Sequence, residues 1–146
     1  MIVKVRKIAS TEAQEMSRIM GWANYHPKLK HPVFGNILVH VPNEGKRSII
    51  GNSVLFGRGG GKVGFPDLFL PIPKTAHSIF VDELNNRIEI NHLIHAGMFI
   101  ELKRINGGTV SINQHAWIGY LNSPGYYAVI CRGADKAIEE IERYLG

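Results

Sequence analysis

The segment Phe99–Lys103 constrains the fold of this chain most strongly, because apolar residues alternate in it with Glu101 and Lys103. A period of two is typical of a β-strand, in which side chains two residues apart share one face. We therefore expect Glu101 and Lys103 to lie together on one face, while Ile100 and Leu102 face the core. A carboxylate beside an ammonium within an apolar strand requires an explanation, either as a local salt bridge or as part of a site.

Helical patterns lie on both sides of this strand. Thr11 with Gln14, and Ser111 with Gln114, have the spacing of a capping box, in which side chains satisfy free N–H groups at a helix start. Short apolar runs predict further strands. The predicted helices are 12–23, 48–56, 112–121 and 134–145, and the predicted strands are 36–41, 66–70, 99–103 and 127–131. Strands alternating with helices in 146 residues indicate a single α/β domain over 1–146, with a sheet covered by helices.

The stretch 71–97 fits two different structures. A hairpin would turn at Asn85–Asn86, with apolar pairs two residues apart in each strand, Ile79 with Val81 and Ile88 with Ile90. A helix over Glu83–Ile94 fits almost as well.

Composition excludes several classes of protein. No apolar run approaches the ~18 residues of a membrane span, and the first residues lack the hydrophobic region of a signal peptide. The single cysteine, Cys131, excludes an internal disulfide and an all-cysteine zinc site, so we expect a reducing, cytoplasm-like compartment and a buried structural thiol. A net charge of +5 favours a polyanionic partner only mildly.

Asp67, at the end of the segment Gly64–Asp67, supplies a second carboxylate if its strand neighbours Phe99–Lys103. Two carboxylates suit Mg²⁺ or Mn²⁺, and Lys103 would position the attacking water or stabilise charge on a phosphate. Such a set would hydrolyse a phosphodiester. A PD sequence followed by ExK also arises easily by chance, so a salt bridge at a strand edge stays the simpler alternative.

Six segments in the same order resemble motifs of the VRR-NUC (virus-type replication-repair nuclease) family, within the PD-(D/E)xK nuclease superfamily. The resemblance covers most of the chain and implies a restriction-endonuclease-like core, that is, a mixed central sheet flanked by helices. The six segments are 11–15, 41–48, 64–68, 99–104, 111–114 and 125–133.

The resemblance implies a role for each matching residue. Asp67 and Glu101 would be metal ligands for Mg²⁺ or Mn²⁺, and Lys103 the catalytic lysine. Glu12 would be the carboxylate of the opening helix that completes the metal site, although Glu15 lies one turn further on the same face and is the alternative. Both acids would also suit the positive end of a helix dipole without any ligand role. Gln114 would line the site, serve only in the capping box, or do both.

Other positions are candidates for DNA contact. A turn that resembles the family's "PNGGKRS" sequence contributes Asn43, Glu44, Lys46 and Arg47, with Glu44 where glycine is expected. The glycine-rich loop 57–64 fails the Walker A pattern, so Arg58 and Lys62 are candidates for phosphate contact from a flexible loop, or simply part of a connection. Residues 75–96 look like an insertion that serves dimerisation or DNA contact, or only decorates the surface.

The expected protein is therefore a metal-dependent DNA endonuclease of the free-standing phage or prophage type. The resemblance implies a homodimer that resolves four-way (Holliday) junctions in the cytoplasm of a bacterial or phage-infected cell, with no membrane partner. A flap or general endonuclease, and a catalytically silent DNA-binding protein on the same fold, are the alternatives.

Overall fold

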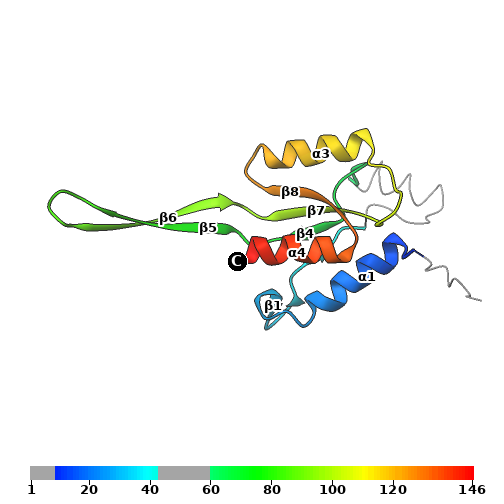
Figure 1. The fold of residues 1–146 in the computed structure, drawn as a ribbon, viewed down its shortest axis with the longest axis horizontal. Coiled ribbons are helices and arrows are strands. Elements are labelled where there is room, and N and C mark those ends of the chain that lie inside the picture. The colour runs from blue at the N-terminus through cyan, green and yellow to red at the C-terminus, as the bar shows by residue number, and fades with distance from the viewer. Residues whose placement is uncertain (1–8, 43–59) are drawn as a thin grey trace, which may run out of the picture.

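The structure is a computed structural model that describes residues 9–42 and 60–146. A four-stranded sheet lies at its centre, with helices on both faces (Figure 1). This arrangement confirms the predicted α/β class with a mixed sheet. In spatial order the strands are β3 (Val39–His40), β4 (Leu68–Leu70), β7 (Met98–Lys103) and β8 (Tyr127–Arg132), and the main helices are α1 (Glu12–Ala23), α3 (Ile112–Asn122) and α4 (Ala134–Leu145).

The direction of each strand follows from its connection to the next one. Strand β4 is antiparallel to both of its neighbours, β3 and β7, whereas β7 and β8 are parallel and are joined through α3. Leu68 lies opposite Ile100, so the next position outward sets Asp67 beside Glu101. The sheet therefore brings the two predicted carboxylates side by side where its inner strands β4 and β7 meet.

Strand β7 is buried on both of its faces, which is why it organises the core. Ile100 and Leu102 pack in the apolar cluster that α1 and α4 cover. Phe99 packs on the opposite side, against Phe65, Trp117 and other apolar residues beneath α3. The predicted alternation of β7 is correct, but its polar side also lies under a helix rather than in open solvent.

The strand predicted over 36–41 was wrong in one respect, because the structure divides it. Gly35–Asn36 (β2) pairs with Lys30–His31 (β1), which follows a short 3-10 helix, Pro27–Leu29, and Val39–His40 joins the main sheet. Asn36 Oδ1 accepts a hydrogen bond of 2.9 Å from the Leu38 N–H. This bond from a side chain to the backbone competes with strand pairing and separates the two pieces.

The ambiguous stretch forms a hairpin, so the alternative helix over Glu83–Ile94 is wrong. Strands β5 (Lys74–Val81) and β6 (Arg87–His95) pair along their length and project from the body as one arm, Lys74–His95 (Figure 1). Asp82 forms the turn by accepting hydrogen bonds of 2.9 Å from Leu84 N and 2.8 Å from Asn86 N. These bonds lower the pKa of the Asp82 carboxyl, the side-chain bond from Asn86 having the largest effect.

Three further predictions concern the rest of the chain. No helix within the described residues is long and apolar enough to cross a membrane. The predicted helix over 48–56 lies outside the described residues. Cys131 is free and buried in β8, as expected, and its burial raises the pKa of the thiol to about 12, so the thiol stays protonated at neutral pH.

Candidate active site

Four polar side chains are buried together where β4, β7 and α3 meet. Asp67 is 7% exposed, Glu101 1%, Lys103 5% and Gln114 3%. Burial of charged groups is costly unless they are paired or serve a ligand. The salt bridge between Glu101 and Lys103, which was the simpler interpretation of the sequence, is present but buried, and it lies within this larger set.

Asp67 is fixed to the backbone of the neighbouring strand. Its Oδ2 accepts a hydrogen bond of 2.8 Å from the Leu102 N–H. The carbonyl of Asp67 in turn accepts one of 2.7 Å from the Val41 N–H. These bonds hold the Asp67 carboxylate beside Glu101, where β4 and β7 meet, and leave it little freedom to turn away.

Glu101 lies between a cation and an amide. Lys103 Nζ is 3.1 Å from Glu101 Oε1, and Gln114 Nε2 donates a hydrogen bond to the same oxygen. Gln114 also completes the predicted capping box, since its Oε1 accepts a bond of 2.8 Å from the Ser111 N–H. The two roles weighed for Gln114, capping α3 and facing the carboxylate cluster, therefore coexist in one side chain.

Gly64 sets the distance between the Asp67 segment and the start of α3. It has φ +78°, and a Cβ on it would lie 2.7 Å from Asn113 Cβ and 2.8 Å from Gln114 N. Trp117 Nε1 also donates a hydrogen bond of 3.2 Å to the Val63 carbonyl. Only glycine permits this approach, so Gly64 helps to hold Gln114 against Glu101.

We predict that Gly64→Ala destabilises the fold, because the left-handed backbone alone costs about 1–2 kcal/mol and the helix start must also move. Urea unfolding of the purified protein measures the effect. Gly119→Ala is the matched control, since a Cβ added at Gly119 in α3 would have no neighbouring atom within 4 Å and helix propensity favours alanine. Equal stability of the two variants would show that the Gly64 contact is unimportant.

Glu12 lines the same hollow as Asp67. The hollow has a volume of about 420 Å³, and His40 and apolar residues of α1 also line it. Glu12 is half-buried at the start of α1. The structure thus places the opening helix so that one of its two first-turn acids shares a cavity with Asp67.

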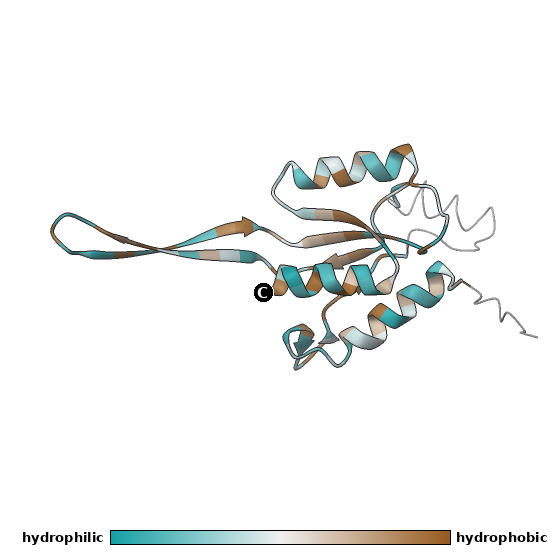
Figure 2. Cartoon of the chain, in the orientation of Figure 1, coloured by the Kyte–Doolittle hydropathy of each residue, from teal (hydrophilic) through white to brown (hydrophobic). Residues whose placement is uncertain are grey.

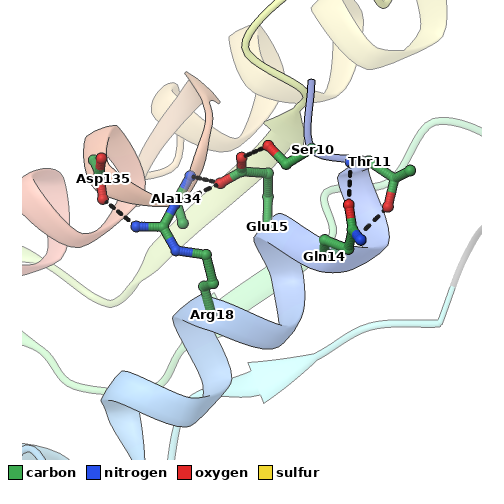
Figure 3. A network of polar contacts seen from close by, with 7 residues as sticks. All are labelled: Ser10, Thr11, Gln14, Glu15, Arg18, Ala134 and Asp135. Atoms are coloured by element: carbon green, nitrogen blue, oxygen red, sulfur yellow. Dashed lines mark hydrogen bonds and ion pairs between the residues drawn. The ribbon is translucent and has the colours of Figure 1, made fainter. Parts of the chain in front are cut away.

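Glu15 has a different environment, shown in Figure 3. It is fully buried, and its Oε2 accepts a hydrogen bond of 2.6 Å from the Ala134 N–H and lies 3.2 Å from Arg18 Nη1. Ser10 Oγ donates to its other oxygen. Helix α4 has no side-chain cap of its own at Gly133, so Glu15 supplies that cap from α1.

These contacts determine the charge of Glu15. The hydrogen bond from Ser10, followed by that from Ala134 and the nearby Arg18 guanidinium, lowers the pKa of the Glu15 carboxyl below its ordinary value of 4.5. The carboxylate is therefore ionised in the folded protein and is occupied in joining α1 to α4.

The carboxylate oxygens of Asp67 and Glu101 fit a small divalent cation. Asp67 and Glu101 offer oxygen ligands, and Mg²⁺ uses one or two carboxylates together with waters and substrate phosphates. Within residues 9–42 and 60–146, no three His, Cys, Asp or Glu side chains group as a complete ligand set. Asp67 and Glu101 leave coordination positions open for water, a further acid or substrate phosphate oxygens.

The DNA-contact candidates lie mostly beyond the part of the chain that the structure describes. Lys62 is exposed in the turn that leads to Gly64. Outside the described residues lie Asn43, Glu44, Lys46, Arg47 and Arg58.

His40 is the lining residue that sequence reasoning missed. Its strand was predicted, but nothing in the local pattern distinguished it from the other histidines. The pairing of His40 with Leu68 in the sheet brings it beside the Asp67 segment. Its place directly before the 41–48 motif was the one available signal.

Comparisons with known proteins show the family and the fold of this chain. The model of the VRR-NUC domain family matches residues 10–135, a range that includes the whole buried cluster. Among solved structures, one described as a VRR_NUC domain protein has a TM-score of 0.66 and 25% sequence identity, and the match covers 94% of this chain and 90% of that one. No curated protein matches the chain.

Proposed function

This chain belongs to the VRR-NUC family, whose domain is a nuclease of the PD-(D/E)xK type, and we propose that it is a Mg²⁺- or Mn²⁺-dependent DNA endonuclease. The observation that carries the proposal is that Asp67, Glu101 and Lys103 are buried together where the inner strands β4 and β7 meet. Nucleases of this type generally use divalent metal ions and act on DNA.

Asp67 and Glu101 would hold the metal ion, and Glu12 would complete the site directly or through water. The shared hollow supports Glu12 in this role, and the cap on α4 argues against Glu15, because Glu15 would have to leave three partners to bind a metal. A bound divalent ion supplies Lewis-acid stabilisation of the charge that develops on the scissile phosphate.

The residues of the chain would assist the hydrolysis of the phosphodiester bond. A water molecule gives up a proton to bulk solvent as it attacks phosphorus in line, the opposite P–O bond breaks, and the leaving oxygen takes up a proton from solvent. The Lys103 ammonium, held by Glu101 at 3.1 Å, would orient the water or stabilise the negative charge on the phosphate oxygens. Gln114 would keep Glu101 in position through its amide group.

We further propose that the protein acts as a homodimer on four-way DNA junctions. A two-fold dimer presents two identical sites, which suits paired nicks in a junction with the same symmetry. A flap or general endonuclease on the same fold is the nearest alternative, and a silent DNA-binding protein is the alternative from another class. We place the activity in the cytoplasm of a bacterial or phage-infected cell.

Cleavage of labelled DNA tests the proposed function. A four-way junction, a flap, a linear duplex and a single strand are each incubated with the wild-type protein and Mg²⁺ or Mn²⁺. We expect paired, symmetric nicks in the junction. Equal cutting of every substrate would remove the junction preference and keep the nuclease, whereas junction binding without any cutting would favour the silent binding protein.

We predict that His40→Ala lowers the cleavage rate about tenfold, because the substitution removes the imidazole from the wall of the hollow that Glu12 and Asp67 share. Single-turnover cleavage with saturating metal measures this. His77→Ala on the arm is the control and should cleave as fast as the wild type. An unchanged rate in His40→Ala would remove His40 from the site.

A further inference from the structure

One face of helix α3 carries an aromatic hollow that the proposed chemistry does not use. Its volume is about 320 Å³, and the side chains that line it are Asn113, Ala116, Trp117 and Tyr120. Residues three and four apart share one helix face. Tyr120 is 64% exposed there, and hydrophobic residues of α3 lie between hydrophilic ones along an outer side of the molecule (Figure 2). The hollow has the size of a small-ligand site, roughly 300–1,000 Å³.

The indole of Trp117 is held in place before any ligand arrives. Its Nε1 donates a hydrogen bond of 3.2 Å to the Val63 carbonyl, and its ring meets Phe65 edge-on with 4.9 Å between centroids. The Tyr120 ring stands at 85° to the indole, with 5.9 Å between their centroids. The two rings therefore form a corner that offers a planar ligand one ring to stack on and the edge of another.

The hollow lies next to the buried carboxylate cluster. Asn113 directly precedes Gln114, whose amide contacts Glu101. Trp117 follows one turn later, roughly 5 Å further along the helix axis. The Val63 carbonyl that holds the indole belongs to the segment that leads into β4. A ligand in the hollow would thus be a close neighbour of a phosphate bound at the proposed active site.

Charge indicates the class of ligand. The segments 60–66 and 104–126, which include the hollow, contain Lys62 and Arg104 but no Asp or Glu, and both cations are exposed. Helix α3 packs mainly on β7 and β8, in which the one acid, Glu101, is buried. Phosphates can therefore approach this side without repulsion from a surface carboxylate. Cations beside exposed aromatic rings are typical of surfaces that bind unpaired nucleotides.

We propose that this hollow binds an unstacked nucleobase of the substrate strand, beside the phosphate that is cut. The base stacks in the corner of Trp117 and Tyr120, and the Asn113 amide offers a donor and an acceptor to its edge. Because every base has a π-face, the contact selects DNA with an unpaired base at the cut rather than a particular sequence. The inference rests on the proposed function for its substrate class, and it deepens that function by naming a feature of the DNA that is recognised.

Fluorescence anisotropy of two labelled single strands tests the inference in excess chelator, where no metal-dependent cutting occurs. One strand is a thymidine oligonucleotide, and the other has the same length and phosphates but abasic sugars in place of its central nucleotides. The wild type should bind the thymidine strand roughly tenfold more tightly, and Tyr120→Ala should reduce this preference to about twofold or less. Ala116→Leu, which fills the hollow, should do the same. Tyr25→Ala is the matched control, since Tyr25 is an 83% exposed tyrosine outside α3, and should keep the wild-type preference.

The outcomes either support or overturn the inference. Equal affinity of the wild type for both strands would overturn it, as would an unchanged preference in Tyr120→Ala. Sedimentation velocity without DNA adds a second check, because a dimer lost in Tyr120→Ala with its base preference intact would assign the hollow to a second copy of the chain. Thermal unfolding establishes that each variant is folded. Because no cleavage is measured, failure of the nuclease proposal leaves this result unaffected, and equal affinities would leave the nuclease proposal standing.

Discussion

Replacing Lys103 by methionine is expected to lower the rate of metal-dependent DNA cleavage by about 10²–10³-fold. Methionine fills a similar space in the buried position but removes the ammonium that contacts Glu101 at 3.1 Å. The charge that Lys103 offers to the water or the phosphate is lost, while the strand keeps its packing. Single-turnover cleavage of the four-way junction measures the rate.

Two controls make this result specific. Lys136→Met removes a cation from the half-exposed ion pair with Glu139 and should leave the cleavage rate unchanged. Thermal unfolding is needed as well, because removal of one partner from a buried charge pair can itself destabilise a domain. A folded Lys103→Met protein that cleaves at the wild-type rate would exclude the catalytic role of the lysine.

The second large effect concerns stability rather than chemistry. Glu15→Gln should lower the free energy of unfolding at neutral pH by about 3 kcal/mol, because a buried carboxylate that accepts three polar contacts becomes neutral. Since the folded-state pKa of Glu15 lies below 4.5, its stabilisation is complete above that pH and is lost as the pH falls through the lowered pKa. The difference between wild type and variant should therefore shrink in acid.

Urea unfolding at several pH values measures this difference, and Glu12→Gln is the matched comparison from the same helix turn. We expect Glu12→Gln to retain wild-type stability and to lose cleavage, and Glu15→Gln to lose stability while its folded fraction still cleaves. The reverse pattern would make Glu15 the metal-site acid of α1.

Local features of the fold were predictable from the sequence. The bounds of α1 and α4 match the prediction, and both capping boxes form, because these features depend on neighbouring residues in the chain. The shared face of Glu101 and Lys103 follows in the same way from the two-residue period of a strand.

Features that depend on distant contacts were not predictable. The sequence favoured Glu12 over Glu15 as the acid of the opening helix but could not separate their roles. In the structure they differ because α4 begins beside Glu15 and lacks a side-chain cap of its own. His40 likewise enters the hollow through the pairing of β3 with β4. The choice between hairpin and helix for the arm was settled by the turn at Asp82, whose carboxylate accepts several hydrogen bonds.

Cleavage of a labelled four-way junction by the wild type and by Asp67→Asn, each with Mg²⁺ and with excess chelator, tests the central claim most directly. The substitution keeps the shape of Asp67 and removes the charge that a metal ion requires. The account predicts cutting only by the wild type and only with metal. Equal cutting by Asp67→Asn, or cutting by the wild type in chelator, would contradict a metal-dependent nuclease site at Asp67 and Glu101.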